Sequence, residues 1–293
     1  MSDVSLGQYL IETSVMFFIF LSVAIAISWV AYIKHYYDLP FRMFEGPKLS
    51  IKDVMLFFLI FLGMYMLLGP QILKILFQFP ILAGNPFVLY SFMQMTIFFM
   101  TVVCFFVYGL FQDRHEMSKI FKDYAFPGKQ SVSKDIFIGL ITWFIALPVV
   151  ITFSQLAEVV TSVFFGKPEK QQVAVEALKT ATDHPVSFVT VLISILIFAP
   201  FLEEFLFRGV LQSWIRSKTG AIAAIFISGF AFAILHYAPE QGWTNIPLIA
   251  SLFVLGCYLG FIYEKSRSLF APIVLHVTFN FISVIRILLL EGK

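Results

Sequence analysis

The sequence predicts an all-α fold, a polytopic membrane bundle of about eight transmembrane helices, on three observations. Of its 293 residues, 59% are hydrophobic and 13% are charged, whereas soluble domains carry roughly 25% charged residues. The apolar residues are gathered in stretches close to the 20 or so residues that a bilayer-crossing helix needs. The basic residues are concentrated in every second connection, as the positive-inside rule requires. We therefore expect a multi-pass integral membrane protein.

The spans follow from the apolar stretches taken in order. A Gly-Pro pair at residues 69 and 70 is expected to kink the second span, and the polar stretch from Gly166 to His184 is expected to form an external loop or a short surface helix. The expected spans run from about Tyr9 to Ile33, Val54 to Phe77, Pro86 to Leu110, Ile136 to Phe165, Pro185 to Ser217, Ala221 to His236, Ile246 to Tyr263, and Phe270 to Leu290.

The charges predict the orientation of the bundle. Basic residues follow the first, third, fifth and seventh spans, which places these connections in the cytoplasm and both chain ends on the opposite side. The composition suits a bacterial cell (inner) membrane, which we expect, as well as an endoplasmic reticulum. The basic connections contain Lys34, Arg42, Lys48 and Lys52, then Arg114, Lys119, Lys122, Lys129 and Lys134, then Arg216 and Lys218, and finally Lys265 and Arg267.

Other features of the composition exclude several classes of function. The formal net charge of +2 gives no basis for a nucleic-acid partner. The two cysteines, Cys104 and Cys257, lie in different apolar stretches, which argues against a disulfide framework and a thiolate zinc site. The first apolar stretch has no basic segment before it, so we expect a retained helix rather than a cleaved signal peptide.

The fifth apolar stretch contains a cluster of ionisable residues. Glu203 and Glu204 are adjacent, and Arg208 follows four residues later. A charged side chain at that depth costs about 2.5–3.5 kcal/mol on insertion scales. A structural ion pair between helices is the alternative to a functional site, and the presence of partners elsewhere in the chain decides between them.

Two histidines and an asparagine are the expected partners. His236 ends the sixth stretch, and His276 and Asn280 share a face of the eighth because they are four residues apart. At about 1.5 Å per residue, all three positions reach depths that overlap with that of Glu203. We expect the three helices to present these groups to one cavity inside the bilayer.

This set of residues is suited to hydrolysis by water. A carboxylate beside an imidazole can hold and deprotonate a water molecule, and a second histidine with an amide can stabilise an oxyanion. Arg208 is expected to keep Glu204 ionised, which leaves Glu203 to transfer the proton. A serine or cysteine nucleophile is less compatible with the sequence, because Cys257 has no histidine or aspartate four residues away.

The motifs resemble those of the CAAX protease and bacteriocin-processing (CPBP/Abi) family, which includes the type II CAAX prenyl endopeptidases. The resemblance covers about Ser131 to Leu290. The motifs are EExxxR at Glu203, Glu204 and Arg208, FxxxH at Phe232 and His236, and HxxxN at His276 and Asn280.

The resemblance implies an intramembrane endopeptidase with a conical active-site cavity and Glu203 as the general base. It also divides the chain into variable N-terminal helices (residues 1–130) and a catalytic membrane domain (residues 131–293). It further implies that His236 helps to place the water. His276 and Asn280 would form the oxyanion hole, and Glu204 and Arg208 would form a supporting ion pair.

The expected partners are the lipid bilayer and a peptide or protein substrate at the membrane, including lipidated CAAX-type substrates. No cofactor is required by the residue set, although zinc would accept Glu203, His236 and His276 as ligands. The alternative function is a non-catalytic membrane scaffold of the same fold that binds another membrane or envelope protein. A proton-coupled carrier is disfavoured because the sequence shows no repeat symmetry.

Overall fold

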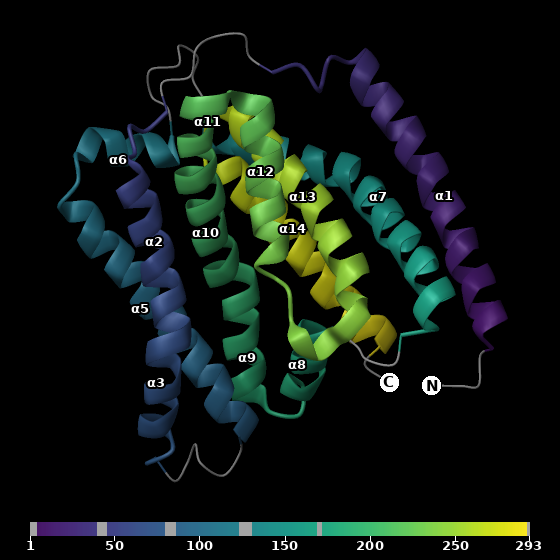
Figure 1. Cartoon of the computed structure of the whole chain (residues 1–293), viewed down its shortest axis with the longest axis horizontal. Helices are drawn as coiled ribbons and strands as arrows, with labels where there is room; N and C mark the ends of the chain where they lie inside the picture. Colours follow the sequence, from purple (N-terminus) through teal and green to yellow (C-terminus); the bar gives the residue numbers. More distant parts are fainter. Residues whose placement is uncertain (1–4, 40–45, 80–85, 123–130, 169–171, 292–293) are drawn as a thin grey trace.

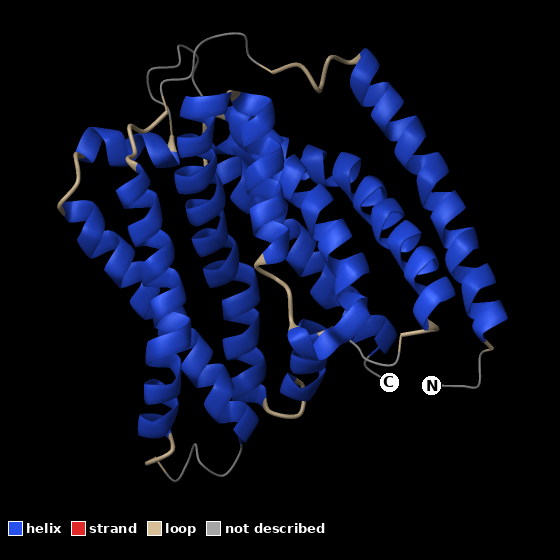
Figure 2. Ribbon diagram, viewed as in Figure 1, coloured by secondary structure: helices blue, strands red, loops and turns tan. Residues whose placement is uncertain are grey.

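The computed structural model describes residues 5–39, 46–79, 86–122, 131–168 and 172–291. Every regular element in these residues is a helix (Figures 1 and 2), as the sequence predicts. Seven helices of the described residues are long and apolar enough to cross a membrane. These helices make the chain a multi-pass membrane protein. The described residues do not include the basic residues Arg42 and Lys129. They also do not include residue 130, so the predicted domain boundary between residues 130 and 131 falls at the edge of a described range.

The spans agree closely with those predicted from the apolar stretches. The N-terminal half contains α1 (Leu6–Ile33), α2 (Ile51–Gly63), η1 (Met64–Leu68), α3 (Gly69–Leu76), α5 (Pro86–Leu110) and the short α6 (Arg114–Phe121). The C-terminal half contains α7 (Val132–Phe165), α8 (Val173–Ala181), α9 (Pro185–Ile193), η2 (Ser194–Phe198), α10 (Ala199–Glu204), η3 (Phe205–Gln212), α11 (Ser213–Thr219), α12 (Ala221–Ile234), η4 (Pro239–Thr244), α13 (Asn245–Ser266), α14 (Phe270–Arg286) and η5 (Ile287–Glu291).

The expected irregularity at Gly69-Pro70 takes the form of a π-turn. In η1, the N–H of Gly69 donates to the carbonyl of Met64, five residues back. The same arrangement precedes Pro200, where the N–H of Ala199 donates to the carbonyl of Ser194. Proline has no N–H to donate. In each π-turn the residue before the proline donates to the carbonyl five residues back instead of four, so the hydrogen-bond pattern changes one residue before the missing donor. The helix thus continues through both prolines.

The sixth predicted span is the one that differs from a full membrane helix. α12 has 14 residues, which corresponds to about 21 Å. The chain then continues without regular helix through His236 to η4, as the coil after α12 in Figure 1 shows. Non-helical backbone is tolerated at membrane depth only where protein groups satisfy it. Asn245 does this for Ala238, since its Oδ1 accepts from the Ala238 N–H at 3.0 Å and its Nδ2 donates to the Ala238 carbonyl at 2.8 Å.

Helices from both halves of the chain share one apolar core. The ring of Phe57 on α2 lies 5.2 Å from those of Phe105 on α5 and Phe205 on η3. On the other side of the molecule, α1 packs along α7 (Figure 1). The continuous helix from α9 to α11, which carries the glutamates, is therefore packed against α2 and α5 on one side and against α12, α13 and α14 on the other.

Candidate active site

The predicted ionisable cluster lies on the continuous helix α9–α11, where α10 passes into η3. The side chains of Glu204 and Arg208 are both fully buried. Arg208 Nη1 donates to Glu204 Oε1 at 3.2 Å. Removing two charges from solvent is costly unless further hydrogen bonds satisfy them. The surroundings of this pair supply such bonds.

Arg208 is bound from two further directions. Its Nη2 donates to the carbonyl of Gly256 on α13 at 3.1 Å. Its guanidinium carbon lies 4.6 Å from the ring centroid of Phe232 on α12, which is the arrangement of a cation–π contact. Gly256 also lies where α12 and α13 approach closely, since a Cβ on Gly256 would lie 2.9 Å from Gly229 Cα.

The same face of the helix continues towards the predicted cytoplasmic side as a polar ladder. Gln212 Nε2 donates to the Gly260 carbonyl at 3.0 Å and to Glu264 Oε1 at 3.1 Å. Arg216 Nε then lies 2.6 Å from Glu264 Oε2. Residues at four-residue intervals on η3 and α11 are thus paired with residues at four-residue intervals on α13. This ladder fixes the rotation of the glutamate-bearing helix about its own axis.

His276 on α14 joins the two glutamates. Its Nδ1 lies 2.8 Å from Glu204 Oε1, and its Nε2 lies 3.8 Å from Glu203 Oε2. Because a carboxylate only accepts hydrogen bonds, Nδ1 carries a hydrogen and donates it to Glu204. The side chain of His276 is 5% exposed. Its ring orientation is therefore fixed by Glu204, and its second nitrogen is directed at Glu203.

His236 reaches the same carboxylate from the unwound end of α12. Its Nδ1 lies 2.8 Å from the carbonyl of Phe232, four residues back. A carbonyl can only accept, so Nδ1–H is the donor. The neutral ring then has its lone pair on Nε2, which lies 3.7 Å from Glu203 Oε2. The side chain is 31% exposed, so this is the open side of the cluster.

Glu203 is the group at which the two histidines converge. Its Oε2 is buried and makes no hydrogen bond to the residues that the structure describes, although the side chain as a whole is 16% exposed. The separations of 3.7 and 3.8 Å from the two Nε2 atoms are too long for direct hydrogen bonds. A polar contact across such a gap is typical of a site that holds a bridging water.

Asn280, one turn after His276, makes a different contact from the one predicted. Its Nδ2 donates to the carbonyl of Ile195 at 2.9 Å. That carbonyl has no donor in its own helix, because the N–H of Ala199 is used by Ser194 and Pro200 has none. Asn280 thus satisfies the backbone group that the π-turn leaves unpaired. One of its two amide hydrogens is used in this contact.

The structure brings together five of the six predicted site residues. The sixth, Asn280, instead donates a hydrogen bond to the backbone carbonyl of Ile195. Three participants were not identified as such from the sequence: the aromatic ring of Phe232 and the carbonyls of Gly256 and Ile195. Phe232 belongs to the FxxxH motif, which was its only signal. The two carbonyls had none, because any residue type supplies a carbonyl.

A zinc ion does not fit the arrangement. Within the described residues, no group of three His, Cys, Asp or Glu side chains is placed to hold a metal ion. The neighbouring carboxylate, Glu204, is engaged by Arg208 and His276. The predicted ligand set of Glu203, His236 and His276 is thus not among groups placed to hold a metal ion in the described residues.

Comparison with known protein families identifies one match. Residues 185–282 match the model of a family described as "Type II CAAX prenyl endopeptidase Rce1-like". The matched residues contain all three motifs and run from the start of α9 into α14. Searches of curated proteins and of solved structures gave no match to this chain.

Proposed function

We propose that this chain, whose residues 185–282 form an Rce1-like domain of the type II CAAX prenyl endopeptidase (CPBP/Abi) family, is an intramembrane endopeptidase that uses a glutamate-activated water. The observation that carries the proposal is the unpaired Oε2 of Glu203, which lies 3.7 and 3.8 Å from two histidine nitrogens. This is the geometry that a general base and its water require.

In the proposed reaction, water donates one hydrogen to Glu203 Oε2 and the other to the lone pair of His236 Nε2. Both hydrogens are then held, and a lone pair of the water oxygen is left to attack a peptide carbonyl. A C–O bond forms, the carbonyl electron pair moves to oxygen, and Glu203 takes the proton. As the tetrahedral intermediate collapses, the C–N bond breaks and Glu203 returns the proton to the departing amine.

The oxyanion is proposed to receive hydrogen bonds from His276 and Asn280. Since Nδ1–H of His276 donates to Glu204, Nε2 becomes a donor only when the ring is an imidazolium. With that charge, the positive His276 and Arg208 balance the negative Glu203 and Glu204, which suits an apolar environment. Asn280 contributes the amide hydrogen that Ile195 does not use.

The substrate is proposed to be a peptide segment at the membrane, including lipid-modified CAAX-type peptides, which enters a conical cavity on the His236 side. Glu204 and Arg208 would hold the machinery in place without touching the substrate. On this proposal residues 131–293 are the catalytic membrane domain, residues 1–130 are the variable helices, and the protein acts in a bacterial cell membrane.

Cleavage of quenched-fluorescent peptides, with and without a farnesyl group, by the purified protein in detergent tests the proposal. Removing a general base is expected to lower kcat about 10²–10⁴-fold, so Glu203→Gln and His236→Ala should both lose activity. Glu176→Gln and His115→Ala change exposed residues away from the cluster and are the matched controls. Cleavage that survives in Glu203→Gln would contradict the proposed base.

A chelator arm tests the metal-independent mechanism. Because no three-ligand group converges among the described residues, activity is expected to be unchanged after treatment with 1,10-phenanthroline and dialysis. Loss of activity that returns on adding zinc would contradict it. The alternative function, a scaffold of the same fold, predicts a folded protein that retains a bound partner with no cleavage of any peptide.

A further inference from the structure

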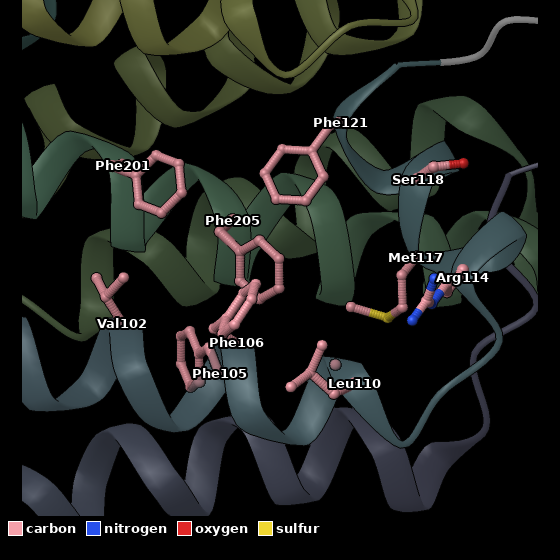
Figure 3. Close-up of a pocket in the computed structure, with 11 residues that line it drawn as sticks. Val102, Phe105, Phe106, Leu110, Arg114, Met117, Ser118, Phe121, Phe201 and Phe205 are labelled. Atoms are coloured by element: carbon pink, nitrogen blue, oxygen red, sulfur yellow. The ribbon is translucent and has the colours of Figure 1, made fainter.

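A cavity lies on the side of the glutamate-bearing helix that faces away from the candidate active site. It has a volume of about 340 Å³ and is enclosed by α5, α6 and the junction of α10 with η3 (Figure 3). Nine of its eleven lining residues have no charged or hydrogen-bonding side chain. Its residues on the glutamate helix are Phe201 and Phe205, whereas the candidate active site is formed with α12 and α14.

The polar groups of this cavity are confined to one end. Arg114 and Ser118, four residues apart on α6, lie at one end of the cavity in Figure 3, and Val102 and Phe201 lie at the opposite end. Along α5, the apolar wall from Val102 to Leu110 corresponds to about 12 Å. The cavity is thus an apolar slot with a cation at one end.

Arg114 is available to a ligand. It is exposed, and its guanidinium makes no ion pair or hydrogen bond with the residues that the structure describes. The nearby acidic groups are engaged elsewhere: Asp113 accepts from the N–H groups at the start of α6, and Glu116 binds Lys119 and the backbone N–H of Lys48. The positive charge at the mouth is therefore not neutralised by its neighbours.

The slot is oriented like a lipid of the cytoplasmic leaflet. α6 follows the third span, in a connection that the charge pattern places in the cytoplasm. Arg114 then lies at the headgroup level, and Val102 lies deeper in the bilayer. Phe106 and Leu110 at the edge are 66% and 55% exposed, so the slot opens sideways to the surrounding lipid.

The geometry points to a binding site for an anionic phospholipid, with its phosphate on Arg114 and one acyl chain in the slot. A guanidinium binds a phosphate through paired, charge-assisted hydrogen bonds, and each buried methylene of the chain adds favourable burial. The second acyl chain remains in the bilayer at the open edge. The bound chain packs against Phe201 and Phe205, two residues on either side of Glu203, and so stabilises the helix that carries the candidate base.

The test uses the full-length protein, purified and washed free of lipid in detergent. Its thermal unfolding midpoint is measured with dioleoyl phosphatidylglycerol, with dioleoyl phosphatidylcholine, and with inorganic phosphate alone. The expected result is stabilisation that is greatest with phosphatidylglycerol and absent with phosphate. Equal stabilisation by the two lipids, or full stabilisation by phosphate, would overturn the proposal.

Three variants locate the effect. Arg114→Gln should bind phosphatidylglycerol about tenfold more weakly, since a charged hydrogen bond is lost, and should no longer distinguish the two lipids. Gly109→Phe should fill the slot, because a Cβ there meets only Met117 Cε at 3.5 Å. Lys34→Gln, which removes an exposed cation at the end of α1, is the matched control and should behave as the wild type.

Native mass spectrometry provides an independent readout of the same site. Wild type and Lys34→Gln are expected to retain one phosphatidylglycerol under conditions in which Arg114→Gln retains none. Retention by Arg114→Gln equal to that of wild type would place the lipid elsewhere and refute the assignment. Because Arg114 is exposed and outside the apolar core, this variant is expected to fold, which keeps the test decisive without Gly109→Phe.

Discussion

The adjacent residues Glu203 and Glu204 lie in different environments, although they have the same side chain. Glu204 is fully buried, and its Oε1 accepts hydrogen bonds from Arg208 and His276, whereas its Oε2 has no hydrogen-bond partner among the described residues. Glu203 is partly exposed, and its Oε2 likewise has no hydrogen-bond partner among the described residues. A buried carboxylate that is paired with an arginine serves structure, and a carboxylate without such a pair in a partly open site is typical of catalysis.

This difference predicts that replacing glutamate by glutamine changes the stability by different amounts at the two positions. Glu204→Gln leaves the Arg208 guanidinium buried without its counter-charge, which costs about 3–5 kcal/mol, so a large fall in the thermal unfolding midpoint is expected. Glu203→Gln changes a partly exposed carboxylate whose Oε2 makes no hydrogen bond to the described residues, so it should lower that midpoint much less while abolishing cleavage. Thermal unfolding of the two purified variants is the measurement. Equal destabilisation by both would refute the division of roles.

Phe232 is predicted to position the histidines without itself reacting. Its fully buried ring lies 4.8 Å from the ring of His236 and 5.7 Å from that of His276, and its face receives Arg208. Phe232→Leu keeps the site apolar but loses these ring contacts. We expect kcat to fall by about tenfold or more with little change in KM.

A conservative variant separates this effect from simple unfolding. Phe232→Trp retains a ring face for Arg208 and should keep more activity than Phe232→Leu if the larger ring is accommodated. The unfolding midpoint is measured beside the kinetics. If Phe232→Leu loses stability and activity in proportion, the ring has a packing role only.

At the scale of elements, the π-turn and α14 are coupled through one hydrogen bond. Asn280 Nδ2 donates to the Ile195 carbonyl, which the missing N–H of Pro200 leaves unpaired. Asn280→Leu should cost about 1–3 kcal/mol, because a partly buried acceptor loses its donor. The stability loss is measured by denaturant or thermal unfolding in detergent.

A double-mutant cycle with Pro200→Ala isolates that bond. An alanine supplies an N–H, so the Ile195 carbonyl can be satisfied within the helix by residue 199 or residue 200. The cost of Asn280→Leu is then expected to be smaller in the Pro200→Ala background than in wild type. Strictly additive costs would show that Asn280 does not act through this carbonyl.

The contact between α12 and α13 is predicted to depend on the absence of a side chain. A Cβ on Gly256 would lie 2.9 Å from Gly229 Cα, and the backbone there cannot move aside as a flexible side chain would. Gly256→Ala should therefore separate the helices, displace the carbonyl that binds Arg208, and lower both stability and cleavage. Gly63→Ala, where a Cβ meets nothing within 4 Å, is the control and should be neutral or slightly stabilising.

At the scale of the whole molecule, the spans were predictable because membrane helices must be long, apolar and internally hydrogen-bonded. α1, α5 and α7 end within a few residues of the predicted limits. The predicted sixth span, Ala221 to His236, ends within two residues of α12, which ends at Ile234. The way in which the non-helical backbone beyond it is satisfied was not predictable, because the contact with Ala238 comes from the side chain of Asn245, seven residues later.

The residues of the candidate site were also predictable from the sequence, but some of their contacts were not. Charge in an apolar stretch indicated Glu203, Glu204 and Arg208, and helical spacing placed His276 and Asn280 on one face. The bond between Asn280 and Ile195 was not predictable, because it depends on a change of hydrogen-bond register within the helix. The pairing of His276 with Glu204 rather than directly with Glu203 likewise depends on the rotation that the ladder along α13 imposes.

The arrangement of the helices gives a final prediction on topology. The start of α1 and the C-terminal end of α14 lie towards the same end of the bundle in Figure 1, as expected if α12 and the chain beyond it make an eighth crossing. Ser217 and Thr182 are exposed and should then lie on opposite sides of the membrane, with Ser217 in the cytoplasm. With Cys104 and Cys257 replaced by alanine, an impermeant maleimide should label a Thr182→Cys variant in intact cells, and a Ser217→Cys variant only after permeabilisation. Labelling of both variants in intact cells would mean that α12 does not carry the chain across, and that His236 approaches Glu203 from a segment that re-enters the membrane.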